Sequence, residues 1–181
     1  MSIARHHAEW LSLVPVSGPF LSLPVLMEAF PQGLDAHDAE HARQLRLACE
    51  EWEDSFQRKT IDPSVHKAGI RFVLTKTLEF DESLLAEGQA IPQTLQVEVP
   101  EHGELLRPDI VVTSPSGPGT PNPGARLLIQ SYPRAQDLTS YVAGARWKAS
   151  PETRMTELLH GAGVRLGLVT NGEHWMPVDA P

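Results

Sequence analysis

Asp109 is a residue whose type and position in the sequence could support catalysis. It follows Arg107 and Pro108 and precedes the apolar run Ile110–Val112. A carboxylate beside such a buried run is costly unless a metal ion, a cation or hydrogen bonds compensate its charge. Two interpretations therefore stay open. Either Arg107 or a backbone turn satisfies Asp109 structurally, or Asp109 is a present or former metal ligand.

A second apolar run, "ARLLIQSY" over residues 125–132, ends in polar side chains that could face the same site. Its last residues are Gln130, Ser131 and Tyr132. The separation between Asp109 and Gln130 suits two adjacent strands that are joined by a long hairpin loop rich in glycine and proline. We therefore expect Asp109, Gln130 and Tyr132 to lie near one another at the ends of neighbouring strands.

The order of these segments resembles a known family. The runs "RPDIVV" and "ARLLIQSY", followed by "PETRMTELLHGAGV" and "RLGLVTNGEHWMPV", resemble the PD-(D/E)xK nuclease-like domain, and the resemblance covers about residues 93 to 178. Such domains stand at the N-terminus of type IIG-like restriction–modification proteins and in adenine-specific DNA methylases of DISARM-type anti-phage defence systems. The resemblance implies a restriction-endonuclease-like fold, in which two acids and a lysine hold Mg²⁺ and polarise the attacking water.

The resemblance also implies that the catalytic site is altered. Asp109 matches the first acid, but Gln130 stands at the second acid and Tyr132 at the lysine. Mg²⁺ prefers carboxylate oxygens, whereas Gln130 offers a neutral amide. A tyrosine with a pKa near ~10 is neutral at pH 7 and cannot replace a cation beside a phosphate. A relocated acid, Glu98 on the preceding strand or Asp137, is the evident way in which the site could still hold Mg²⁺.

Four basic residues are candidates for contacts with nucleic acid: Arg107, Arg146, Lys148 and Arg154. The last three surround the expected N-terminus of a helix over residues 150–163, where the helix dipole and nearby cations suit a phosphate. The same pattern also suits Trp147 as an aromatic core residue with solvated neighbours, and both interpretations stay open.

The pattern of apolar residues and breakers predicts the elements that position these side chains. Helices are expected over residues 38–57, from Pro63 with Asp62 as its cap, and over 150–163. Strands are expected over 93–99, 105–113 and 125–132, in a meander, and over 164–178 as a hairpin with an Asn-Gly turn. The fold class is therefore α/β, a mixed sheet flanked by helices with additional N-terminal helices. We expect an N-terminal helical part, 1–92, and a nuclease-like core, 93–181, in one compact domain.

Composition and charge limit the classes of function. The 181 residues carry a formal net charge of −8, which argues against a chain that binds nucleic acid along its whole surface. Cys49 is the only cysteine, so neither a disulfide framework nor a cysteine-based zinc site is expected. The N-terminus lacks the pattern of a secretion signal, and no apolar run is long enough to span a bilayer. We expect a cytoplasmic protein with no membrane partner. Because the chain stops just after a strand-like run, we also expect it to be part of a longer protein.

Three functions follow as hypotheses. The first is a catalytically degenerate nuclease-like module of a restriction, modification or phage-defence protein, which binds DNA or positions methylase or helicase domains. The second is an active Mg²⁺-dependent endonuclease that uses Asp109 with a relocated acid, in which case Mg²⁺ is the only cofactor expected. The third is a structural docking domain that makes no contact with DNA.

Overall fold

The computed structural model describes residues 2–18, 20–34, 38–57, 63–115 and 124–181, and it divides the chain into two compact units. The first unit covers residues 1–42 and the second covers residues 43–181. Helix α4 and strand β1, both of which precede residue 93, belong to the second unit. The expected division at residue 92 stays a prediction.

The first unit contains two short helices, α1 (Ile3–Leu11) and α2 (Leu23–Ala29). They pack through the buried side chains of His7 and Leu26. The Nε2 atom of His7 lies 3.0 Å from the carbonyl oxygen of Phe30, at the end of α2. These are additional N-terminal helices of the predicted kind.

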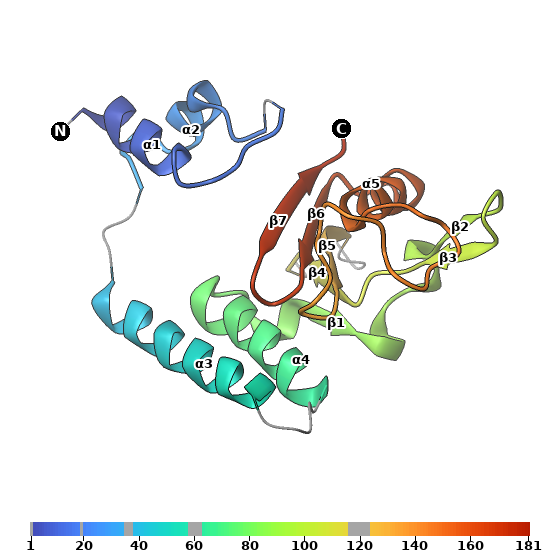
Figure 1. The fold of residues 1–181 in the computed structure, drawn as a ribbon. Coiled ribbons are helices and arrows are strands. Elements are labelled where there is room, and N and C mark those ends of the chain that lie inside the picture. The colour runs from blue at the N-terminus through green and yellow to red at the C-terminus, as the bar shows by residue number, and fades with distance from the viewer. Residues whose placement is uncertain (1, 19, 35–37, 58–62, 116–123) are drawn as a thin grey trace. The chain divides into compact units, whose positions relative to one another are not determined.

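The second unit is built on a five-stranded mixed sheet with the order β1-β4-β5-β6-β7 (Figure 1). The strands are β1 (Leu85–Glu87), β4 (Ile110–Thr113), β5 (Ala125–Ser131), β6 (Leu166–Thr170) and β7 (Trp175–Asp179). Strands β5 and β6 are parallel because α5 connects them, and the other pairs are antiparallel. The predicted class, a mixed α/β fold with a sheet flanked by helices, is confirmed.

Helices cover both faces of the sheet. The remaining helices are α3 (Ala39–Gln57), α4 (Pro63–Phe72) and α5 (Pro151–Ala162), and a π-helical turn, Val73–Thr77, continues α4. On one face, Met155 of α5 packs with Leu128 of β5. On the other face, Ile70 of α4 packs with Ile129, the next residue of β5. Successive side chains of a strand point to opposite faces, so one strand supplies both cores.

Both antiparallel pairings of the expected three-strand meander form, but its middle strand is broken in two. The segment predicted as one strand over 105–113 forms two, β3 (Glu104–Leu106) and β4, which are separated by Arg107–Asp109. Strand β3 pairs with β2 (Val97–Val99) in a separate two-stranded sheet. Pro108 has no N–H for a ladder hydrogen bond and therefore separates the two strands.

Two short elements also differ from the prediction. Gln93–Leu95 forms a 3₁₀ turn rather than the start of a strand. Strand β1 was not predicted, because its three residues are too few to establish an alternating pattern. It completes the sheet by pairing with β4.

The ends of α5 follow their sequence signals. The Ser150 hydroxyl accepts a hydrogen bond from the Thr153 N–H at 3.2 Å, Pro151 is the first helical residue, and Gly163 ends the helix with φ 66°. The expected helices over 38–57 and from Pro63 are also present, although the proposed cap Asp62 lies outside the described residues. In the part of the chain that the structure describes, no helix combines the length and the apolar character needed to cross a membrane.

Candidate functional site at the ends of β4 and β5

Asp109 lies exposed just before β4, where its carboxylate contacts the end of β5. Its Oδ2 atom accepts hydrogen bonds from the backbone N–H of Ser131 at 2.7 Å and from the Ser131 hydroxyl at 3.0 Å. Its own N–H donates to the carbonyl of Ile129 at 2.9 Å, which continues the β4–β5 pairing. Ser131, rather than Arg107, therefore supplies the hydrogen bonds that satisfy Asp109.

The side chains of Gln130 and Tyr132 are joined by a hydrogen bond. The Gln130 side chain is buried, its Nε2 donates to the Arg107 carbonyl at 3.1 Å, and its Oε1 accepts from the Tyr132 hydroxyl at 3.3 Å. Alternation along the strand places Gln130 and Tyr132 on the face of α5, and Ser131 on the face of α4. The structure thus brings Asp109, Gln130 and Tyr132 to the same strand ends, as the sequence predicted.

Glu104 is a residue of this region that the sequence interpretation missed. Its carboxylate forms an ion pair with Arg154 of α5 at 2.5 Å, and the two side chains are only 14% and 12% exposed. Glu104 shares one face of β3 with the buried Leu106, whereas Leu105 between them points to the opposite, exposed face. That alternation was the available signal, because an acid on a core-facing position needs a partner.

The pKa of Tyr132 shows how these groups influence one another. Burial raises the pKa of the Tyr132 phenol above its usual value. The positive charge of Arg154 opposes this rise, and the negative charges of Asp109 and Glu104 add to it. Tyr132 is therefore a neutral hydrogen-bonding group at neutral pH, unlike the cation that a lysine would provide.

Glu104 keeps its charge despite burial. Desolvation alone would raise the pKa of Glu104, but hydrogen bonds from the Arg154 guanidinium and the Arg146 backbone N–H hold the pKa below the usual value. The Arg146 N–H lies 2.7 Å from Glu104 Oε1. This carboxylate is thus ionised but already neutralised by Arg154.

The two acids suggested as replacements lie elsewhere. Glu98 is exposed on the outer face of β2, since its neighbours Val97 and Val99 face the core. Asp137 accepts hydrogen bonds from the N–H and hydroxyl of Thr139, both at 2.8 Å, and these bonds lower its pKa. Among the described residues, no three His, Cys, Asp or Glu side chains form a group able to hold a metal ion. The binding of Mg²⁺ at Asp109 stays a prediction.

The four cations predicted to contact nucleic acid have different surroundings. Arg154 pairs with Glu104, and the Lys148 ammonium lies 5.3 Å from the centre of the Tyr141 ring. Arg146 is exposed, and its Nη1 atom lies 3.4 Å from the Gly103 carbonyl oxygen. Arg107 is exposed and precedes Asp109 by two residues. Their contact with nucleic acid stays a prediction.

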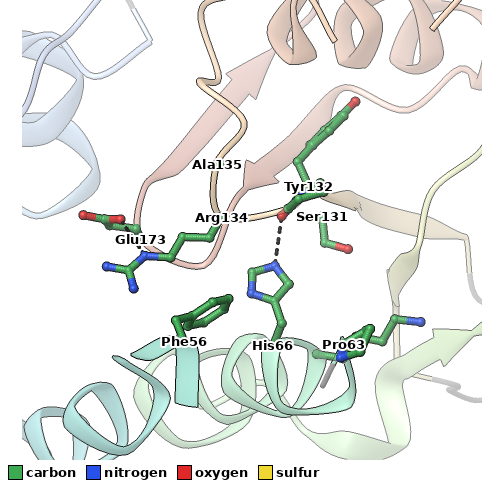
Figure 2. A pocket seen from close by; sticks show the side chains of 10 residues that line it. Phe56, Pro63, His66, Ser131, Tyr132, Arg134, Ala135 and Glu173 are labelled. Carbon is green, nitrogen blue, oxygen red and sulfur yellow. Dashed lines mark hydrogen bonds and ion pairs between the residues drawn. The ribbon is translucent and has the colours of Figure 1, made fainter. Parts of the chain in front are cut away.

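Two cavities have Ser131 in their linings. The first, here called the apolar cavity, has a volume of about 690 Å³ and lies between the ends of α3 and α4 and the segment after β5 (Figure 2). Its walls include Phe56, Pro63, His66, Pro133 and Ala135. The second, here called the polar cavity, has a volume of about 490 Å³. Its lining includes Lys67, Arg71, Arg107 and Asp109.

Lys67 and Ser131 line both cavities. Arg71 in the polar cavity is neutralised by ion pairs with Glu82 and Glu87. Lys67 and Arg107, by contrast, form no ion pair or side-chain hydrogen bond with any described residue. They are the basic side chains next to Asp109 that remain available to an external anion.

Comparison of the chain with protein-family models, with curated proteins and with solved structures gave no match.

Proposed function

We propose that the protein is a nuclease-like module of a DNA restriction, modification or phage-defence protein that binds DNA and does not cleave it. The observation that carries this proposal is that the polar side chains near the ends of β4 and β5 already have partners within the protein. Asp109 is hydrogen-bonded to Ser131, Gln130 and Tyr132 are neutral partners of each other, and the nearby Glu104 is paired with Arg154. Mg²⁺ is usually held by one or two carboxylates, and the acids of the polar cavity are Asp109, hydrogen-bonded to Ser131, and Glu87, paired with Arg71.

The residues beside Asp109 support contact with a phosphate. Lys67 comes from α4 and Arg107 from the segment before β4, and both line the polar cavity. Because neither is neutralised by a described residue, both are available to a DNA backbone. Asp109 itself opposes an anion, so we expect binding that is moderate in strength and strongly dependent on salt.

A plasmid-nicking assay separates this function from that of an active endonuclease. The wild-type chain is incubated with supercoiled DNA and Mg²⁺ or Mn²⁺, beside Asp109→Ala. We expect no cleavage by either protein. Cleavage by the wild type that Asp109→Ala abolishes would establish the endonuclease and overturn the loss of catalysis.

A gel-shift titration at increasing salt tests the DNA contact. We expect a shift at low salt that weakens as salt rises, and a marked loss for Lys67→Ala combined with Arg107→Ala. Arg126→Ala is the matched control, because Arg126 is an exposed arginine on β5 that lines neither cavity. If the wild type gives no shift at low salt, the chain is a docking domain for methylase or helicase partners, and the DNA-binding function is wrong.

A further inference from the structure

We propose that the two cavities together bind one nucleotide, with the base in the apolar cavity and the phosphate beside Lys67 and Arg107 in the polar cavity. This inference rests on the proposed DNA-binding function and specifies it. The nucleotide is one that has left the base stack or that belongs to a single strand, since a paired base cannot enter a cavity.

The apolar cavity has a size and lining suited to a base. Its volume of about 690 Å³ lies in the range of small-ligand pockets, roughly 300–1,000 Å³. Figure 2 shows Phe56 and His66 rising from α3 and α4 toward the segment that carries Ser131, Arg134 and Ala135. An uncharged, flat and largely apolar group is therefore favoured in this cavity.

The polar cavity, which shares Ser131 with the apolar cavity, supplies the opposite chemistry. Lys67 and Arg107 carry two positive charges without ionic partners among the described residues, while Asp109 carries one negative charge. The Arg71 guanidinium pairs with both the Glu82 and the Glu87 carboxylates, so it offers no free positive charge. Lys67 and Arg107 are therefore the cations that favour an anion in this cavity, and a ligand that reaches both cavities must join an apolar ring to that anion. A nucleotide has this composition.

Contacts behind the apolar cavity indicate that it exists before a ligand binds. The Nε2 atom of His66 donates a hydrogen bond to the Tyr132 carbonyl at 2.9 Å, which fixes α4 to the end of β5. Trp52 packs edge-on against Phe56, with ring centres 4.8 Å apart. The Arg134 guanidinium lies 5.2 Å from the centre of the Phe56 ring. Because these contacts already hold the cavity wall in place, binding of a ligand should lose little conformational entropy of the protein.

The test is a titration of the full chain, followed by NMR chemical shifts, with three separate probes in the absence of divalent ions. The probes are deoxyadenosine monophosphate, deoxyadenosine and inorganic phosphate. We expect the nucleotide to bind at least about tenfold more tightly than either fragment. Lys67→Ala and Arg107→Ala are each expected to weaken nucleotide binding about tenfold, because a hydrogen bond to a charged group is lost.

Two further variants address the base and the charge. Ala135→Trp places a large side chain at an exposed wall position and should block the base without removing any existing contact. Asp109→Asn removes the negative charge that opposes the phosphate and should strengthen nucleotide binding several-fold. Arg126→Ala should leave binding unchanged.

Equal binding of phosphate and nucleotide would overturn the inference, since it would indicate an anion site alone. Equal binding of the nucleoside and the nucleotide would overturn it as well, as would binding that Ala135→Trp leaves intact. The DNA gel shift is scored separately. A shift that Ala135→Trp does not weaken keeps the proposed function but removes the nucleotide site, whereas nucleotide binding without any DNA shift removes the proposed function alone.

Discussion

The buried carboxylate of Glu104 depends on the guanidinium of Arg154 for its charge balance. Replacing Glu104 by glutamine leaves Arg154, whose Nε atom already lacks a partner among the described residues, without a counter-charge. Breaking an ion pair costs about 0–1 kcal/mol at the surface and about 3–5 kcal/mol when it is fully buried, so a partly buried pair should cost about 1–3 kcal/mol. We therefore expect Glu104→Gln to lower the free energy of unfolding in urea by about that amount. Glu98→Gln, on the exposed face of the neighbouring strand, should change it by less than about 0.5 kcal/mol.

The same pair predicts a dependence of stability on pH. The pKa of Glu104 lies below its usual value of 4.5 because its hydrogen bonds outweigh the effect of burial. The folded protein therefore binds the Glu104 proton less tightly than the unfolded chain does. The resulting stabilisation is complete above about pH 4.5 and is lost as the pH falls through the lower, folded pKa. Below pH 4.5 we expect the unfolding free energy of the wild type to fall more steeply than that of Glu104→Gln.

The sequence predicted part of this site and missed the rest for a physical reason. Asp109, Gln130 and Tyr132 were placed together because strand pairing brings their backbones together. Glu104 and Arg154 are 50 residues apart, and only the packing of α5 against β3 joins them. No local pattern encodes that contact. The cavity wall of Phe56 and His66 was missed for the same reason, since it depends on how α3 packs against α4 and how α4 contacts the end of β5.

The fit of α5 against β2 depends on the missing side chain of Gly161. A Cβ atom at this position would lie 2.4 Å from Val97 Cγ1 and 2.6 Å from Cγ2. Alanine favours a helix over glycine by roughly 1 kcal/mol, but overpacking of this kind costs about 1–3 kcal/mol. We expect Gly161→Ala to destabilise the protein by about 1 kcal/mol in chemical denaturation.

A double-mutant cycle checks this mechanism. Val97→Ala removes both methyl groups, so adding it to Gly161→Ala should cost less than it does alone, and the coupling should be favourable. Glu157→Ala, at an exposed position of α5, serves as the control. Additive costs in the cycle would contradict the predicted contact between Gly161 and Val97.

Elements with strong local signals were predicted most accurately. Ser150, Pro151 and Gly163 set the limits of α5. Asn171 and Gly172 lie in the predicted turn, but the connection covers residues 171–174 and is longer than the tight turn expected. Strand β1 and the break between β3 and β4 were not predicted, since three-residue strands depend on their partners rather than on their own sequence.

The contact of Trp52 in α3 and His66 in α4 with the β6–β7 turn depends on Gly172. Its φ is 85°, and a Cβ atom there would lie 2.8 Å from Trp52 and 2.9 Å from His66. Gly172→Ala should therefore destabilise the unit of residues 43–181 through both backbone strain and steric conflict, by about 2–4 kcal/mol in total. It should also shift the Trp52 fluorescence.

Gly144→Ala is the matched control for this prediction. Gly144 has a similar φ of 79°, but a Cβ atom at this position would meet no other atom within 4 Å. It should show the cost of backbone strain without the conflict, about 1–2 kcal/mol. Equal effects of the two substitutions would mean that contact with Trp52 and His66 does not limit residue 172.

The two outer strands of the sheet have a consequence for behaviour at high concentration. Within residues 43–181, β1 pairs only with β4 and is three residues long, while β7 pairs only with β6 and carries Pro177 opposite Leu168. A short strand offers few unpaired groups, and a proline offers no donor, so neither border is a good template for strand addition. Self-association of the protein through backbone pairing is thereby discouraged.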